Sequence, residues 1–117
     1  MQNWIACGES FIPGDVVRWK EPVWPQKKSR SKRKIQKLGD RLVTAAVLTT
    51  DNKGYVRLSV LKDEIVDNKF GMPLKALPKG ELLTKKRSTI GKGSAERLKW
   101  SDESARDMAI STFVGSF

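Results

Sequence analysis

The side chains that most often carry acid–base or metal chemistry are missing from this chain. It contains no histidine, which excludes imidazole bases, histidine-containing triads and histidine-ligated metal sites. The single cysteine, Cys7, has no histidine to activate it and is better interpreted as a small buried residue than as a nucleophile. Gly91-Lys92-Gly93-Ser94 lacks the spaced first glycine and the Gly-Lys-Ser/Thr core of a phosphate loop. We therefore expect no enzyme, no cofactor and no metal site. An enzyme built on Lys, Asp and Tyr is the least favoured alternative.

Binding of anions is the chemistry that the remaining side chains support best. Lys and Arg total 23 and Asp and Glu total 13, which gives a formal net charge of +10. Such an excess favours polyanions, because each neutralised phosphate releases condensed counterions. A solubilising surface with no specific partner is the plainer reading of the same charge.

The positive charge is concentrated in two blocks. In residues 26–38, seven of the 13 side chains are cationic and none is acidic. We expect a long, mobile basic loop there, held open by repulsion between like charges. Residues 79–100 hold seven cations and two acids, whereas residues 42–78 are nearly balanced with five cations and four acids. The two blocks would form one patch if the fold brings them together.

Four aromatic residues lie in or beside basic sequence: Trp19, Trp24, Tyr55 and Trp100. Exposed aromatic rings can stack on nucleobases. Packing in the core is the commoner fate of tryptophan in a small domain, and we expect it for Trp19 and Trp100. Trp24, between two prolines, is the best candidate for stacking. The acidic cluster of Asp63, Glu64 and Asp67 lacks a recognised calcium-loop pattern and is better interpreted as solvated surface.

A β-hairpin is the most secure structural element in the sequence. Residues 41–50 are rich in strand-forming side chains, and residues 55–61 alternate between polar and apolar. Asp51-Asn52-Lys53-Gly54 between them is typical of a tight turn. A short strand is predicted over 16–20, after which Pro22 and Pro25 should interrupt regular structure.

Shorter elements complete the prediction for a single domain over residues 1–117. Residues 63–70 fit either a strand end or one helical turn. A strand with a basic outer face is expected over 81–90, and a last strand over 95–100. A C-terminal helix is expected over 101–113, with Ser101 as its N-cap and two acids in its first turn.

The stretch from Gly14-Asp15-Val16-Val17-Arg18-Trp19 through the variable loop to the hairpin at Asn52-Lys53-Gly54 resembles SH3-like small barrels, including their KOW-type modules. The resemblance covers residues 11–61 and implies a first strand entered by a Gly-Asp pair, followed by a loop that often contacts a ligand. With the strand pattern it predicts a mainly β fold, a small SH3-like open barrel of about five antiparallel strands. A fold analogy alone does not establish function.

We interpret the chain as a nucleic-acid-binding protein, for DNA or RNA, that contacts mainly backbone phosphates through the basic loop and a basic sheet face. The alternative is a protein-interaction or adaptor module that docks an acidic protein partner. A cytoplasmic protein is expected, because a single cysteine suits a reducing compartment and no segment reads as a signal peptide or membrane span. The candidate nucleic-acid-binding residues are Arg18, Trp24, Lys27, Lys28, Arg30, Lys32, Arg33, Lys34, Lys37, Arg57, Lys85, Lys86, Arg87 and Lys92.

Overall fold

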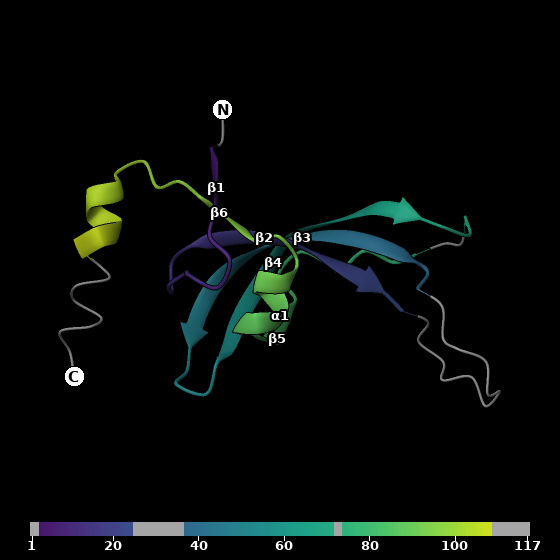
Figure 1. Ribbon diagram of the computed structural model, residues 1–117, viewed down its shortest axis with the longest axis horizontal. Helices are drawn as coiled ribbons and strands as arrows, with labels where there is room; N and C mark the ends of the chain where they lie inside the picture. The colour runs from purple at the N-terminus through teal and green to yellow at the C-terminus, as the bar shows by residue number, and fades with distance from the viewer. Residues whose placement is uncertain (1–2, 25–36, 72–73, 109–117) are drawn as a thin grey trace.

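A computed structural model describes residues 3–24, 37–71 and 74–108 (Figure 1). Its strands are β1 (Trp4–Ala6), β2 (Val16–Val23), β3 (Gly39–Thr50), β4 (Tyr55–Asn68), β5 (Leu82–Lys86) and β6 (Glu96–Leu98). A short helix, α1 (Arg87–Lys92), separates β5 from β6, and a second helical segment covers 103–108.

All six strands that the described residues form belong to one antiparallel sheet, in the order β1-β6-β2-β3-β4-β5. The strands β2 to β5 form a meander, and the chain then returns through α1 so that β6 pairs with β2. This confirms the prediction of a mainly β, antiparallel fold. The sheet has six strands rather than about five, and it is not closed into a barrel.

The core lies on one face of this sheet, which we call the inner face. Along β2, Val17 and Trp19 are fully buried, whereas the residues that alternate with them, Arg18 and Lys20, point to the opposite, outer face. The inner side chains of β3 and β4 meet those of β2, and Ile90 of α1 covers them. Each fully buried large apolar side chain contributes about 1.5–3 kcal/mol. Burial of Trp19 is confirmed, while Trp100 is only half-buried.

The β3–β4 hairpin forms as predicted. Asp51 Oδ1 accepts hydrogen bonds from the backbone N–H groups of Lys53 and Tyr55, both at 2.9 Å. Gly54 adopts a φ of +89°, which glycine reaches without the steric cost that a Cβ would add. The residues 63–70, ambiguous in sequence, continue β4 as far as Asn68.

The prediction that Pro22 interrupts regular structure is wrong, because β2 continues through it to Val23. The N–H of Lys20, two residues earlier, points away from β3 and donates to Gly93 O at 2.8 Å. The nitrogen of Pro22 therefore faces the same side, where β6 no longer reaches, since β6 pairs only with Val17 and Arg18. A missing donor costs little on such an open edge.

Two other boundaries differ from the sequence prediction. The strand expected over 81–90 ends at Lys86, because the chain turns into α1 to place Ile90 in the core. The C-terminal helix starts after Asp102 rather than after Ser101. Asp102 Oδ1 accepts the N–H of Ser104 at 3.0 Å, so Asp102 takes the capping position expected for Ser101. Residues 109–113 of the predicted helix lie outside the described residues.

Candidate nucleic-acid interface

The two ends of the basic loop leave the sheet side by side. β2 ends at Val23 and β3 begins at Gly39, its register partner, and Leu38 N donates to Val23 O at 2.8 Å. Lys37 Nζ lies 3.2 Å from both oxygens of Asp40. Six of the predicted binding residues lie outside the described residues: Lys27, Lys28, Arg30, Lys32, Arg33 and Lys34.

Charge is distributed very unevenly between this loop and the described part of the chain. All 13 acidic residues lie in the described ranges, together with 17 of the 23 cations. The other six cations fall between positions 27 and 34 with no acid among them. Over half of the net charge of +10 therefore belongs to one short segment of sequence.

Exposed aromatic side chains flank the base of this segment. Trp24, the residue after β2, is 52% exposed, and Phe70, two residues beyond β4, is 54% exposed. The end of β4 is held beside the start of β3, because Lys69 N donates to Leu38 O at 3.0 Å. The sequence singled out Trp24 but missed Phe70, since only strand pairing shows that residue 70 lies next to residue 38.

The cations of the second block have separate environments. Lys85 points to the inner face, where its Nζ lies 3.2 Å from Glu21 Oε2. Its neighbour Lys86 points to the outer face and lies 5.9 Å from the centre of the Tyr55 ring. Adjacent strand residues face opposite sides, so these two lysines do not form one binding surface.

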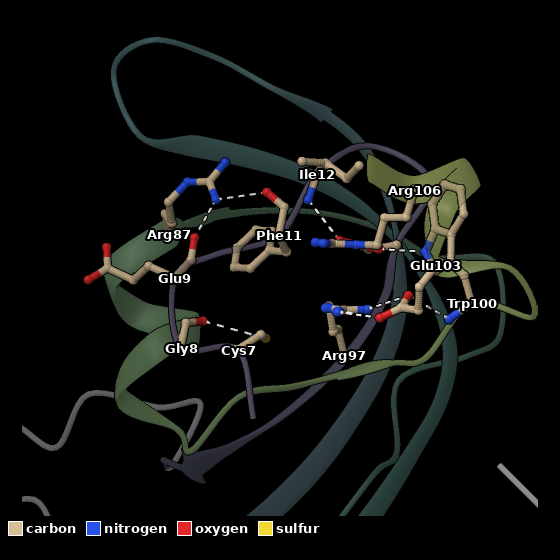
Figure 2. A network of polar contacts seen from close by, with 11 residues as sticks. Cys7, Gly8, Glu9, Phe11, Ile12, Arg87, Arg97, Trp100, Glu103 and Arg106 are labelled. Carbon is tan, nitrogen blue, oxygen red and sulfur yellow. Dashed lines mark hydrogen bonds and ion pairs between the residues drawn. The ribbon is translucent and has the colours of Figure 1, made fainter. Parts of the chain in front are cut away.

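Arg87 has a structural role in the described part of the chain. Its guanidinium donates to the backbone carbonyls of Glu9 and Phe11, the latter at 3.0 Å, and stacks 4.3 Å from the Phe11 ring centre. Figure 2 shows this contact beside α1. Arg87 therefore fixes the segment before β2 to the helix and does not extend the outer face.

Arg57 lies on the outer face with Lys86. Its register partners are Thr49 on β3 and Thr84 on β5, and its side chain is exposed. Tyr55, two residues away on the same strand face, is 41% exposed. Arg57, Lys86 and Tyr55 thus combine two cations with an aromatic ring on a rigid surface, an arrangement suited to a nucleic-acid strand.

The remaining two described candidates differ from each other. Arg18 lies on the outer face but is paired with Glu96 at 3.0 Å and stacks 4.2 Å from the centre of the Trp4 ring. Lys92, at the end of α1, is exposed. Of these two, Lys92 is the more available to an anion.

The attachment point of the first basic block and the exposed cation Arg57 lie at opposite ends of β4. Arg57 lies near the turn at the start of β4, and the basic loop is attached beside Asn68 at its other end. At the usual rise per strand residue, the 11 steps along the strand from Arg57 to Asn68 span about 36 Å. One polyanion can contact both regions only by extending along the sheet.

A polar network joins the C-terminal helical segment to the entry of β2 (Figure 2). The buried carboxylate of Asp15 accepts hydrogen bonds from Ile12 N at 2.9 Å, Trp100 Nε1 at 2.7 Å, and Arg106 Nε and Nη2 at 2.9 and 2.8 Å. Burial by itself would raise the pKa of Asp15, but these donors outweigh it and hold that pKa below its ordinary value. The same contact raises the pKa of Arg106.

A second ion pair supports the first. Arg97 donates two hydrogen bonds to Glu103, at 3.2 and 2.8 Å, and Trp100 N donates to the same carboxylate at 3.2 Å. The hydrogen bond from Arg97 is the main reason that the pKa of Glu103 is lowered.

Nearby, burial raises the pKa of the Cys7 thiol, which disfavours the reactive thiolate.

Comparisons with protein families, curated proteins and solved structures find no match. Among the described residues there is no cluster of three or more side chains placed to hold a metal ion. No helix in the described ranges has the length and apolar character needed to cross a membrane.

Proposed function

We propose that this protein binds nucleic acid, DNA or RNA, mainly through backbone phosphates. The basic loop of residues 26–38 is the principal contact, and the outer-face cations Arg57 and Lys86 are a second one. The single observation that carries the proposal is the run of six cations without an acid between positions 27 and 34, placed between paired strand ends. A cytoplasmic location is part of the same proposal.

The environment of the loop adds support. Trp24 is exposed directly before the loop and Phe70 is exposed beside its other end, so both rings are available for stacking on bases. Lys85 and Arg87 are left out of the interface, because their charged groups are bound to Glu21 and to two backbone carbonyls. Arg18 remains a candidate contact, but it would have to exchange its ion pair with Glu96 for one with a phosphate.

The test compares the wild-type chain with a loop variant in which Lys28, Arg30, Lys32 and Lys34 are replaced by Ser. A charge-matched control carries Ser at Lys53, Lys62, Lys75 and Lys79, which all lie outside the proposed interface. Each protein is purified without nuclease, and its absorbance ratio at 260 and 280 nm is measured before and after a high-salt wash. The wild type and the control should carry nucleic acid that salt removes, because the contact is electrostatic.

The loop variant should carry much less nucleic acid than the control. Equal amounts on both variants would reject the role of the loop. The adaptor alternative predicts a different result: an acidic protein that co-purifies in a one-to-one complex and stays bound after nuclease treatment.

A further inference from the structure

A hollow of about 310 Å³ opens on the outer face of the sheet, where β2 meets β6. Its volume is at the low end of the range for small-molecule sites and suits a group of few atoms. Val16 contributes from β2 with its side chain on the outer face, opposite to the buried Val17. The lining residues are Gly14, Val16, Leu98, Lys99, Trp100 and Ser101. We call it the Trp100 hollow.

The Trp100 ring is fixed before any ligand arrives. Its Nε1 donates to the buried carboxylate of Asp15 at 2.7 Å, and its backbone N donates to Glu103 at 3.2 Å. A Cβ at Gly14 would lie 3.5 Å from the ring, so the chain packs against it there. Because its only polar hydrogen is already used, the ring offers a ligand apolar surface alone. Because the ring is already fixed, binding of a ligand against it costs little conformational entropy.

Lys99 is one of the residues that line this hollow, and it carries a positive charge. Its side chain is exposed, and within the described ranges no carboxylate lies within ion-pair distance of it. The acids that follow in sequence are occupied, since Asp102 accepts the N–H of Ser104 and Glu103 binds Arg97. An apolar aromatic wall beside an unpaired cation matches the two parts of a nucleotide, a planar base and a phosphate.

The outer face leads from the hollow toward Arg57. Val16 pairs with Ala46, and Ala46 pairs with Ser59, which is two residues from Arg57 on β4. The side chains of Ala46 and Ser59 are small, so they obstruct little of the surface between the hollow and the exposed side chain of Arg57. A strand with one base in the hollow therefore has a path toward the outer-face cations.

We propose that the Trp100 hollow receives an unpaired base of a single-stranded nucleic acid, with the adjacent phosphate on Lys99. The inference rests on the proposed function and narrows its ligand to strands with unpaired bases. Bases in a duplex are stacked on both sides and cannot enter such a hollow without being extruded.

The test uses the full chain and three variants. Val16→Phe fills the hollow, Lys99→Gln removes its cation, and Lys79→Gln is a matched loss of one exposed surface lysine elsewhere. Affinity is measured by fluorescence anisotropy for a 15-nucleotide single strand and for a duplex of the same length. The wild type should prefer the single strand. Val16→Phe and Lys99→Gln should each weaken single-strand binding about fivefold or more, the lower range for one base stack, with duplex affinity unchanged.

Lys79→Gln should leave both affinities as in the wild type. If Lys99→Gln and any folded Val16→Phe protein bind the single strand as the wild type does, the hollow is not the base site. That result would leave the proposed role of the basic loop intact. The same unchanged affinities are expected if the hollow binds an apolar segment of a protein instead of a base. Failure of the wild type to bind either oligonucleotide would reject the proposed function itself.

Discussion

Arg106 binds the buried carboxylate of Asp15 with two hydrogen bonds, at 2.9 and 2.8 Å, across 91 residues of sequence. The contact ties the C-terminal helical segment to the turn that starts β2. The same carboxylate holds the Trp100 ring, so the geometry of the Trp100 hollow depends on this pair. The proposed base site therefore depends on a contact that also stabilises the fold.

Replacement of Arg106 by Met should destabilise the protein strongly. The change leaves the Asp15 carboxylate buried without its cation, and breaking a buried pair in this way costs about 3–5 kcal/mol. The double variant Asp15→Leu, Arg106→Met should lose less than the sum of the two single changes, because neither charge is then left alone. Urea unfolding measures these free energies, with the exposed Lys92→Met as control. Equal midpoints for Arg106→Met and Lys92→Met would contradict this account of the pair.

The pair should also make stability depend on pH in the acid range. Because the folded-state pKa of Asp15 is lowered, its contribution is fully present above the unfolded pKa of about 3.9 and is lost as pH falls through the folded value. The difference in unfolding free energy between the wild type and Asp15→Asn should therefore be constant near neutrality and shrink below about pH 4. A difference that grows on acidification would have the wrong sign.

Lys85 and Lys86 provide a matched test of which sheet face binds. Lys86→Gln should weaken nucleic-acid binding and lower the slope of log affinity against log salt by about 0.7–0.9, the value for one phosphate contact. Lys85→Gln removes the same charge from the inner face, where it contacts Glu21, and should change stability more than affinity. The reverse pattern in anisotropy titrations would place the interface on the inner face.

Gly93 should tolerate alanine far less well than Gly80. A Cβ at Gly93 would lie 2.1 Å from the backbone oxygen of Lys20, whereas one at Gly80 meets open space. Gly80 has a φ of +90°, so alanine there carries only the backbone penalty of about 1–2 kcal/mol. The steric conflict at Gly93 should cost about 2–3 kcal/mol and loosen the contact of α1 with β2. Thermal unfolding that ranks Gly80→Ala as the more damaging change would contradict the observed packing.

Local signals in the sequence were sufficient for the hairpin and for the mainly β fold. The turn at Asp51–Gly54 and the alternation after it need no information from elsewhere in the chain. β1 was missed because its three residues have little pattern of their own and are defined by pairing with Glu96–Leu98. The continuation of β2 through Pro22 depends on where β6 ends, which is also a non-local fact.

The candidate site was predictable in composition but not in geometry. The sequence identifies the cations and Trp24, since these are properties of single residues. It does not show that Lys85 meets Glu21, or that Arg87 binds backbone 76 residues earlier at Phe11. Nor does it bring Lys99 and Trp100 beside Val16. These arrangements follow from strand register and from the return of the chain through α1.

The salt dependence of binding to a single-stranded oligonucleotide tests the central claim most directly. If the six cations between positions 27 and 34 each contact one phosphate, affinity should fall more than a hundredfold, on the order of 10²- to 10³-fold, between 50 and 200 mM salt. The variant with Ser at Lys28, Arg30, Lys32 and Lys34 loses four of these contacts, so the slope of log affinity against log salt should fall by about 2.8–3.6. An affinity that hardly changes with salt, or an equal slope for the two proteins, would contradict the account.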